Sequence, residues 1–374
     1  MRMNESKKKL CIIYNYAQHY RASIFKLIDE NYECTFIFGK SYLDVKKMDY
    51  RQLKGKVIEV PVYRCGTFSY RRGNIRQLWH KYDAYIVLGE TRVVSTWIFC
   101  VLSRLFPSKK VYLWSHGWLG KGGNIERIIN KLMFALPKGG TFLYGNYARD
   151  LMIREGYDAR KLFTIHNSLA YEEQVKVRQS LGFKPIYQDH FGNTNYNLIF
   201  VGRLTAVKKL DMVLAAMKLC LGNNHSYNLT FIGDGDMKSD LKTLSNSLCL
   251  EGNVWFYGPC YDEKELGELI YNADLCVSPG NVGLTAIHAM VFGCPVVTHN
   301  SFSNQMPEFE AIKEGETGTF FKYGDVADLS LTIDKWFRER GNSRDLIRQN
   351  CMSEVDNNWT PEFQLNVIKS VIDD

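Results

Sequence analysis

The 374-residue sequence contains no uninterrupted apolar run long enough to cross a membrane. Its longest candidate, residues 93–106, is broken by two serines and an arginine, and it falls short of the roughly 18 residues that a span requires. We expect a helix here, either in the core or on a membrane-facing surface flanked by Lys109 and Lys110. Residues 1–10 are polar and basic and indicate no targeting segment, so the sequence predicts a cytoplasmic protein, soluble or bound peripherally to the membrane.

Patterns that would point to two other protein classes are also missing. The ten cysteines form no CxxC pair and have no regular spacing, which disfavours a disulfide framework or a zinc cluster and favours free thiols in a reducing compartment. The first strand-length apolar run is followed by YAQHYR rather than GxGxxG, and GDGDMK at 233–238 lacks the third glycine. A nicotinamide-dependent oxidoreductase is therefore disfavoured.

Acidic residues are scarce in the first half of the chain. Residues 1–168 contain 29 lysines and arginines against 13 aspartates and glutamates, whereas residues 169–374 contain 18 against 27. We therefore expect the two halves to have different partners and the first half to have an anionic one; a solvated basic surface is the other interpretation. No DNA- or RNA-binding motif is present, so no nucleic-acid partner is expected.

Short apolar runs that end in glycine or proline turns recur along the chain, and helical spacing follows several of them. This alternation predicts an α/β protein with doubly wound parallel sheets, and the length predicts two domains. The first sheet is expected to contain residues 10–16, 34–39, 85–90, 110–114, 140–145 and 162–166. The second is expected to contain residues 197–203, 229–235, 254–258 and 273–279, with a helix over 210–221.

The most informative segment is SPGNVGLTAIHAMVFGCPVV at 278–297. It has the pattern of a strand end, a tight loop, an amphipathic helix and a second strand. Residues 281–285 are expected to expose backbone N–H groups at the helix N-terminus, where an anion is attracted. Arg203 and Lys208 follow another predicted strand, so they would lie at the same carboxyl edge of the sheet. The segment therefore predicts a loop that binds a diphosphate.

These signatures resemble those of the retaining GT-B glycosyltransferases of the family 4 or group 1 type, which use nucleotide-sugar donors. The shared series is Gly-Arg-Leu at 202–204, Lys208, Gly-Asp-Gly at 233–235 and the segment from Gly283 to Met290. The resemblance is strong over residues 196–325 and looser over the first half of the chain. It implies two Rossmann-like doubly wound domains facing across a cleft. The implied division is an acceptor-binding domain at 1–168, a linker at 169–195, a donor-binding domain at 196–345 and a C-terminal helix at 346–374 that crosses back to the first domain.

The resemblance also implies roles for individual residues. Arg203 and Lys208 would hold the donor diphosphate, His116 would lie beside the transferring sugar, and His288 would contact the nucleotide ribose. The implied catalytic residues are His116, Arg203 and Lys208. The implied donor-binding residues are Gly202, Arg203, Lys208, Gly233, Asn281, Val282, Gly283, Leu284, Thr285 and His288. His19 and Arg21, in the loop after the first strand, are expected to meet phosphate or hydroxyl groups of the acceptor; an ordinary surface loop is the other interpretation.

The sequence departs from this family at one pair of positions. The family usually carries two glutamates separated by seven residues, and alignment through Gly283 and Leu284 places Gly280 and His288 there. The side chain expected to grip the transferring sugar is therefore missing, although His288 can still form a hydrogen bond with a ribose hydroxyl. The alternative function is a non-catalytic sugar-nucleotide or glycan-binding partner descended from such an enzyme. A sugar-nucleotide epimerase of GT-B shape is disfavoured by the basic first domain.

The expected reaction needs no cofactor and no metal. Asp234 and Asp236 have the spacing of a metal-binding Asp-x-Asp pair, but they lie in the Gly-Asp-Gly turn. Glu308 either approaches the donor or is a solvated acid. The sequence thus predicts a retaining hexosyltransferase that uses a nucleotide-sugar donor. Its acceptor would be a glycan or a lipid-diphosphate-linked oligosaccharide in lipopolysaccharide, O-antigen or capsule synthesis, at an anionic membrane surface.

Overall fold

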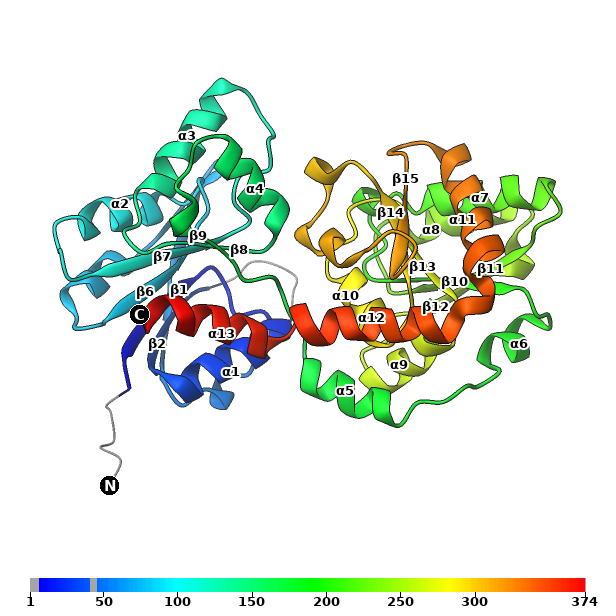
Figure 1. Cartoon of the computed structure of the whole chain (residues 1–374), viewed down its shortest axis with the longest axis horizontal. Coiled ribbons are helices and arrows are strands. Elements are labelled where there is room, and N and C mark those ends of the chain that lie inside the picture. The colour runs from blue at the N-terminus through cyan, green and yellow to red at the C-terminus, as the bar shows by residue number, and fades with distance from the viewer. Residues whose placement is uncertain (1–6, 41–45, 374) are drawn as a thin grey trace. The chain divides into compact units, whose positions relative to one another are not determined.

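The computed structural model describes residues 7–40 and 46–373, and it divides into two compact units. Unit 1 comprises Met1–Ala170 and Pro361–Asp374, and unit 2 comprises Tyr171–Thr360. Each unit is built on a parallel sheet with helices packed against it, as Figure 1 shows. The predicted α/β class with two doubly wound sheets is therefore confirmed. The expectation of no targeting segment at the start of the chain falls partly on residues 1–6, which lie outside the described residues.

Unit 1 contains a seven-stranded sheet in which every pair of neighbours is parallel. In spatial order its strands are β3 (Lys56–Val60), β2 (Glu33–Gly39), β1 (Lys9–Tyr14), β6 (Ala84–Leu88), β7 (Lys110–Ser115), β8 (Gly140–Leu143) and β9 (Leu162–Thr164). An antiparallel hairpin of β4 (Val62–Cys65) and β5 (Phe68–Arg71) follows the edge strand β3. The central strands are almost entirely buried, as long apolar runs in parallel sheets require.

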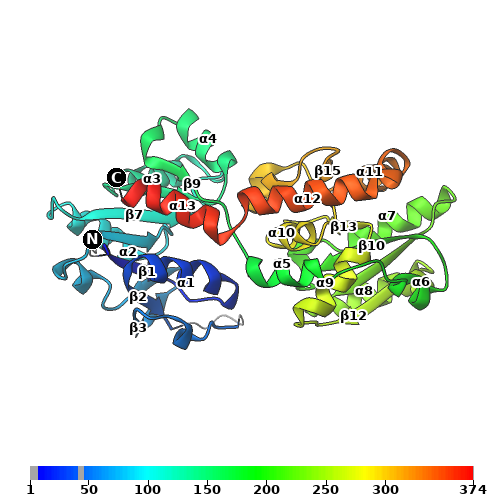
Figure 2. The same ribbon diagram turned by 60° about the horizontal axis from the view of Figure 1, so that its bottom comes forward.

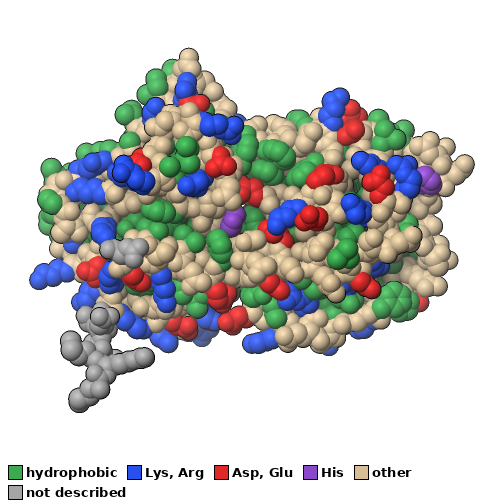
Figure 3. All heavy atoms as spheres, viewed as in Figure 1, with side chains coloured by type: hydrophobic (Ala, Val, Ile, Leu, Met, Phe, Trp, Pro, Cys, Tyr) green, Lys and Arg blue, Asp and Glu red, His purple; other side chains and the backbone are tan. Residues whose placement is uncertain are grey.

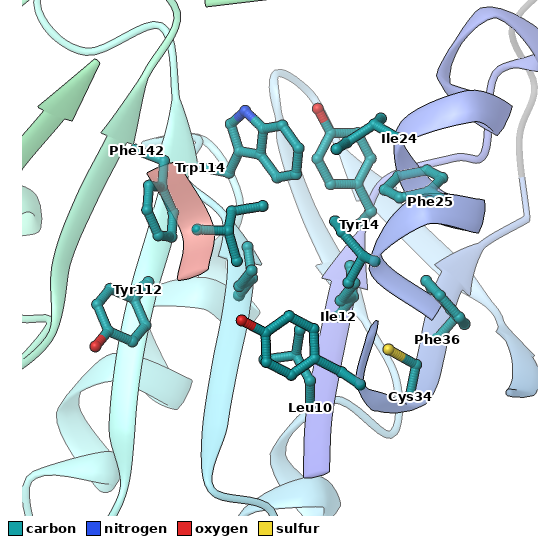
Figure 4. Packing of buried hydrophobic residues seen from close by; sticks show 14 of the residues in the cluster. Leu10, Ile12, Tyr14, Ile24, Phe25, Cys34, Phe36, Tyr112, Trp114 and Phe142 are labelled. Carbon is teal, nitrogen blue, oxygen red and sulfur yellow. The ribbon is translucent and has the colours of Figure 1, made fainter. Parts of the chain in front are cut away.

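Helices cover both faces of this sheet. Successive side chains of a strand point to opposite faces, so Leu10 and Ile12 of β1 belong to one core cluster while Cys11 and Ile13 belong to the other. The first cluster, shown in Figure 4, is closed by α1 (Ala22–Asn31) and α13 (Pro361–Ile372). The second is closed by α2 (Val94–Ser103), α3 (Asn124–Ala135) and α4 (Asn146–Arg154).

Unit 2 contains a six-stranded parallel sheet. In spatial order its strands are β12 (Val254–Gly258), β11 (Tyr227–Ile232), β10 (Tyr196–Val201), β13 (Leu275–Ser278), β14 (Val296–His299) and β15 (Gly318–Phe321). The order reverses direction at β10, which has β11 on one side and β13 on the other. Such a switch point is where ligands bind in open α/β sheets, outside the carboxyl ends of the strands.

Helices of unit 2 pack side by side in pairs (Figure 2). α7 (Asp211–Gly222) contacts α11 (Val326–Arg340), and α10 (Thr285–Val291) contacts α12 (Arg344–Asn358). The remaining helices of this sheet are α8 (Lys238–Ser247) and α9 (Glu263–Asn272).

Residues 171–195 of the segment expected to be a linker, 169–195, are instead part of unit 2. They form α5 (Tyr171–Gln179) and α6 (Ile186–Phe191). Arg178 pairs with Asp356 of α12 at 3.0 Å, and the buried Tyr187 donates a hydrogen bond to the Leu269 carbonyl. These long-range contacts hold a polar stretch that has little helical periodicity of its own.

The C-terminal helix expected at 346–374 is two helices. The turn at Trp359 and Thr360 separates α12, which belongs to unit 2, from α13, which belongs to unit 1. Pro361 opens α13, where its missing N–H group costs nothing because the first N–H groups of a helix have no partner in the helix.

Candidate functional site

The switch point of unit 2 begins with two glycine turns that touch each other. The Gly202 N–H group donates to the Ile232 carbonyl at 2.9 Å, and the Gly233 N–H group donates to the Gly258 carbonyl at 2.8 Å. A Cβ at Gly233 would lie 1.9 Å from the Gly202 oxygen, and both glycines have φ near +145° (147° and 144°). No other residue type fits this contact without moving the backbone.

Lys208 follows the first of these turns in the sequence and contacts the loop after β13. Its Nζ donates hydrogen bonds to the Asn281 carbonyl at 2.6 Å and to the Asn281 Oδ1 at 3.0 Å. Its own carbonyl accepts from the Gly280 N–H group at 3.0 Å. The structure thus brings Lys208 and the loop together, as the resemblance implies, and both ends of the lysine contact that loop.

Gly280 occupies the position of the family's first glutamate, and its surroundings exclude a side chain. A Cβ there would lie 2.1 Å from the Val207 oxygen and 2.8 Å from the Lys208 Cα. Both are backbone atoms of the segment that begins at η5 (Ala206–Lys208), so they cannot rotate away. The close approach of these two backbone segments therefore leaves no room for a carboxylate side chain at this position.

Two polar groups of the loop form hydrogen bonds with neighbouring segments and so fix the conformation of the loop. The Val282 N–H group donates to Oε1 of the buried Gln305 at 2.9 Å, and the Thr285 hydroxyl donates to the Val201 carbonyl at 3.0 Å. Among the described residues, none accepts a hydrogen bond from the N–H groups of Gly283 and Leu284. The expectation that residues 281–285 expose their backbone N–H groups to an anion is thus wrong for Val282, whose N–H group donates to Gln305.

The electrostatics around Lys208 involve two further charges. Burial lowers the pKa of Lys208 to about 8; the negative charge of Glu308 opposes this effect, and the positive charge of Arg203 adds to it. Glu308 is only 1% exposed, so the solvated alternative for this acid is wrong. The Arg203 side chain is exposed. Two cations and one buried carboxylate therefore act together at the carboxyl edge of this sheet.

His288 is paired with a carboxylate from a neighbouring helix. Its Nε2 lies 2.9 Å from Oε1 of Glu263, and Gln174 of α5 donates to the same oxygen at 2.8 Å. Burial alone would raise the pKa of Glu263, but the hydrogen bonds from His288 and Gln174 leave it below its ordinary value. The ring expected to face a ribose thus has one nitrogen committed within unit 2.

In unit 1, Arg21 is buried rather than displayed on a surface loop. Its side chain is 5% exposed, and Nη2 donates to the Tyr144 hydroxyl at 2.6 Å. Tyr144 in turn shares a 2.7 Å hydrogen bond with Tyr14, and the guanidinium lies 5.1 Å from the centre of each ring. His19, by contrast, is exposed and lies against the Lys46 carbonyl. The structure thus separates the two expected acceptor residues into one core residue and one surface residue.

His116 follows β7 and packs against the same aromatic group. Its ring centre lies 4.6 Å from that of Tyr144, although the residue as a whole keeps an exposed surface. Desolvation of the ring and the positive charge of Arg21 lower the pKa of His116 to about 4. The ring is therefore neutral at physiological pH, so one nitrogen can donate a hydrogen bond and the other can accept one.

The comparisons with known proteins agree with this geometry. Residues 188–351 match the model of the family described as glycosyl transferases group 1. EpsD of Bacillus subtilis (strain 168), which bears the name of a glycosyltransferase, is 26% identical over 170 residues, and these cover 45% of this chain and 41% of EpsD. The chain thus spans less than half of that relative.

Two solved structures resemble the whole chain. Anabaena Alr3699/HepE in complex with UDP has a TM-score of 0.71 and 14% identity, with 97% of this chain and 99% of that chain covered. The apo lipopolysaccharide outer core galactosyltransferase WaaB has a TM-score of 0.69 and 14% identity, with 98% of this chain and 99% of that chain covered. The fold is GT-B.

In this GT-B protein, the family match falls within the unit that contains Lys208 and its loop. Across residues 7–40 and 46–373, no helix combines the length and the apolar character that crossing a bilayer demands.

The same residues contain no cluster of three or more His, Cys, Asp or Glu side chains arranged to hold a metal ion. Asp234 accepts a hydrogen bond from the Gly235 N–H group at 2.9 Å and pairs with Lys238.

The sequence interpretation missed three residues that contact predicted site residues, namely Gln305 and Glu263 in unit 2 and Tyr144 in unit 1. Gln305 lies in an irregular segment between β14 and η8 (Pro307–Ala311), and no periodic pattern marks it. Asp262 caps α9 by accepting a hydrogen bond from the Glu265 N–H group. Glu263 comes next, and acids in the first turn of a helix are common, so the sequence pattern did not mark this residue. Tyr144 could have been suspected from its place at the carboxyl end of a predicted strand.

Proposed function

We propose that this protein is a retaining glycosyltransferase that moves a hexose-type sugar from a nucleotide-sugar donor to a glycan or lipid-linked oligosaccharide acceptor. One observation carries the proposal: Lys208 is bound to the loop at Gly280 and Asn281 at the switch point of unit 2, within the segment that matches glycosyl transferases group 1. The UDP held by HepE supports a nucleotide sugar as the donor.

The chemistry follows from where charge develops. When the sugar–phosphate bond breaks, negative charge grows on the departing diphosphate, and fixed cations and oriented N–H groups stabilise it most where water is excluded. Arg203 and Lys208 would supply the cations, and the N–H groups of Gly283 and Leu284 would supply the dipoles. The acceptor hydroxyl attacks from the face that the diphosphate leaves, and a donor phosphate oxygen takes its proton. Neither a protein nucleophile nor a metal is required.

The acceptor is assigned to the basic unit. The excess of lysine and arginine in residues 1–168 supports an acceptor carried on a lipid diphosphate, and the likeness to WaaB supports a role in surface polysaccharide synthesis. We place the protein on the cytoplasmic face of the membrane as a peripheral enzyme. In this assignment His116 is a neutral hydrogen-bonding group of the catalytic set.

The test begins with a panel of nucleotide sugars. We expect one of them to raise the melting temperature of the purified protein, because a ligand that binds only the folded state stabilises it by mass action. That donor should then release its nucleoside diphosphate in the presence of acceptor. Lys208→Ala should lower turnover roughly 100-fold or more, as removal of one charge-stabilising group does in other enzymes. Lys218→Ala, which removes an exposed lysine of α7, is the matched control.

A different outcome would favour the second candidate, a non-catalytic sugar-nucleotide-binding protein. That alternative draws on the absence of any side chain at Gly280 and on the pairing of His288 with Glu263. Saturable binding without hydrolysis or transfer across a broad acceptor panel would support it. If no nucleotide sugar stabilises the protein, both candidates are wrong.

A further inference from the structure

The outer face of α3 in unit 1 is apolar although it is exposed. Ile125, Ile128, Ile129 and Leu132 retain 74%, 58%, 38% and 58% of their accessible surface. Their spacing of three and four residues places them on one side of the helix. Figure 3 shows hydrophobic side chains on the projecting tip over α3, with lysine and arginine side chains among them. This is a continuous stripe, whereas isolated exposed apolar residues are normal on protein surfaces.

Helix α2 carries a second exposed apolar stripe. Val94, Ile98 and Val101 are 40%, 36% and 52% exposed, and Leu105, just beyond the helix, is 73% exposed. The spacing of four, three and four residues again selects one side. The opposite side buries Phe99 and Cys100 together with serine and threonine side chains. The buried side confirms the core interpretation of the segment at 93–106, and the membrane-facing interpretation stays a prediction.

The two stripes point away from the sheet on the same side of unit 1. Side chains of both helices, Phe99 of α2 and Met133 of α3, belong to the same core cluster on one face of the sheet. The C-terminal ends of the helices are joined by Arg104, which donates to the Ala135 and Leu136 carbonyls at 2.7 and 2.8 Å. We call the exposed apolar side chains of these two helices the α2–α3 surface.

The charge around the α2–α3 surface is predominantly positive. Residues 92–138 contain eight lysines and arginines and a single acid, Glu126. Lys121 and Lys131 are exposed beside the apolar stripe of α3, and long basic side chains can keep their charge in water while their stems cover apolar material. The combination of an aliphatic face and a basic border is complementary to an anionic lipid surface.

The composition of the stripes also distinguishes a lipid from a protein partner. Protein interfaces are enriched in tyrosine, tryptophan and arginine at their centres, where side chains fill shaped pockets. The two stripes consist of isoleucine, valine and leucine and contain no aromatic residue. Transfer of aliphatic side chains from water into any hydrocarbon environment is favourable, and it needs no pocket of matching shape.

We propose that the α2–α3 surface docks unit 1 on an anionic bilayer. The apolar side chains enter the boundary between headgroups and acyl chains, and the surrounding lysines and arginines contact lipid phosphates. The proposal rests on the proposed function in that it supplies the contact with the membrane that carries a lipid-linked acceptor.

The experiment measures co-sedimentation of the full chain with vesicles. We expect binding to vesicles of mixed phosphatidylglycerol and phosphatidylcholine and much weaker binding to phosphatidylcholine alone. The double variant Ile128→Ser with Leu132→Ser should bind the mixed vesicles roughly tenfold or more weakly, because it removes two of the inserting side chains. Its matched control is Leu219→Ser with Leu331→Ser, which changes residues of unit 2 that are 46% and 61% exposed, and it should bind like the wild type.

A second pair of variants tests the charge. Lys121→Glu with Lys131→Glu should weaken binding to the mixed vesicles and make it less sensitive to salt, whereas Lys218→Glu in unit 2 should change neither. All the altered side chains are exposed or partly exposed, and unchanged circular dichroism melting curves would confirm that folding is retained.

Two results would overturn the proposal. One is vesicle binding that is absent in the wild type or unchanged in the Ile128 and Leu132 variant. The other is a concentration-dependent dimer, seen by analytical ultracentrifugation, that this variant abolishes while vesicles have no effect; the surface would then join two copies of the chain. Vesicle binding needs no donor, and stabilisation of the same preparation by a nucleotide sugar reports on the proposed function separately.

Discussion

At the residue scale, Lys208 is a cation whose charge depends strongly on its environment. It is largely enclosed, it donates two hydrogen bonds to Asn281, and it lies near the positive charge of Arg203. The negative charge of the buried Glu308 only partly compensates. A lysine with an ordinary pKa stays protonated across the neutral range, whereas a pKa of about 8 leaves Lys208 half deprotonated near pH 8.

Donor affinity should therefore fall with pH above about 8. A bound diphosphate favours the protonated lysine, so binding above the pKa of free Lys208 must take up a proton, and affinity should decrease by up to roughly tenfold per pH unit. Well below pH 8 the lysine is already charged and contributes no slope. Isothermal titration calorimetry with the preferred nucleotide sugar at several pH values checks this.

Lys208→Met is the control for this pH dependence. It should bind the donor more weakly at every pH and show no slope between pH 7 and 9.5 from this group, where the range follows from the pKa of about 8. A wild-type affinity that stays flat across that range would contradict the assignment of Lys208 to the diphosphate.

At the scale of elements, the loop between β13 and α10 is held by a side chain from another segment. Gln305 is 3% exposed and makes three hydrogen bonds: it accepts from the Val282 N–H group and donates to the Thr298 hydroxyl and the His299 carbonyl. The loop that is proposed to bind the donor thus depends on a residue that contributes no charge.

Gln305→Met should loosen this loop. The substitution keeps the length of the side chain but leaves the buried Val282 N–H group without its acceptor, at a cost of about 1–3 kcal/mol in the free energy of unfolding. The KM for the donor should rise as well, because the loop N–H groups lose their fixed orientation. Chemical denaturation and steady-state kinetics measure the two effects.

A buried glutamine in unit 1 provides the matched control. Gln364 accepts from the Ser168 hydroxyl and donates to the His166 carbonyl, and it is fully buried. Gln364→Met should therefore cost comparable stability while the KM for the donor stays unchanged. Equal changes in donor KM for both variants would argue against a specific role of Gln305.

The sequence predicted most of the central strands because their side chains are buried on both faces and form continuous apolar runs. Strand β6 and strand β11 are examples in which every residue is buried. It missed β3, an edge strand that exposes Lys56 and Glu59, and the hairpin of β4 and β5, whose residues are mostly exposed. Their pairing comes from long-range contacts that leave no periodic pattern in the chain.

The candidate site divides in the same way. Gly202, Lys208 and the loop were predicted because backbone constraints and fixed cations leave short signatures at strand ends. The pairing of His288 with Glu263, the burial of Arg21 and the role of Gln305 could not be predicted, because each depends on which distant side chain lies opposite. Local sequence carries no record of that proximity.

At the scale of the whole molecule, the end of the chain completes the core of the first unit. Helix α13 contributes Leu365, Ile368 and Ile372 to the cluster around β1, and the Tyr112 hydroxyl donates to the Val371 carbonyl at 3.1 Å. Unit 1 thus consists of two stretches of sequence that are separated by the whole of unit 2. The stability of unit 1 therefore depends on residues that follow unit 2 in the sequence.

Ile368→Ala should therefore destabilise unit 1 selectively. The side chain is 0% exposed, so its truncation leaves a cavity that costs about 2–5 kcal/mol. Hydrogen exchange should become faster in β1 and β2 and remain unchanged in β10 and β11. Ile333→Ala, a fully buried position of α11, should have the opposite distribution. Uniform acceleration in both units would show that they unfold together.

The tight approach at Gly280 limits how donor preference can be redesigned. Because the Val207 oxygen fills the space that a β-carbon would need, installing a glutamate by one substitution would push apart the segment that carries Lys208. Any attempt to restore an acid at this point must first rebuild residues 206–208. If the proposed transfer is confirmed, engineering of sugar choice should begin with the shape of that short turn and leave position 280 until last.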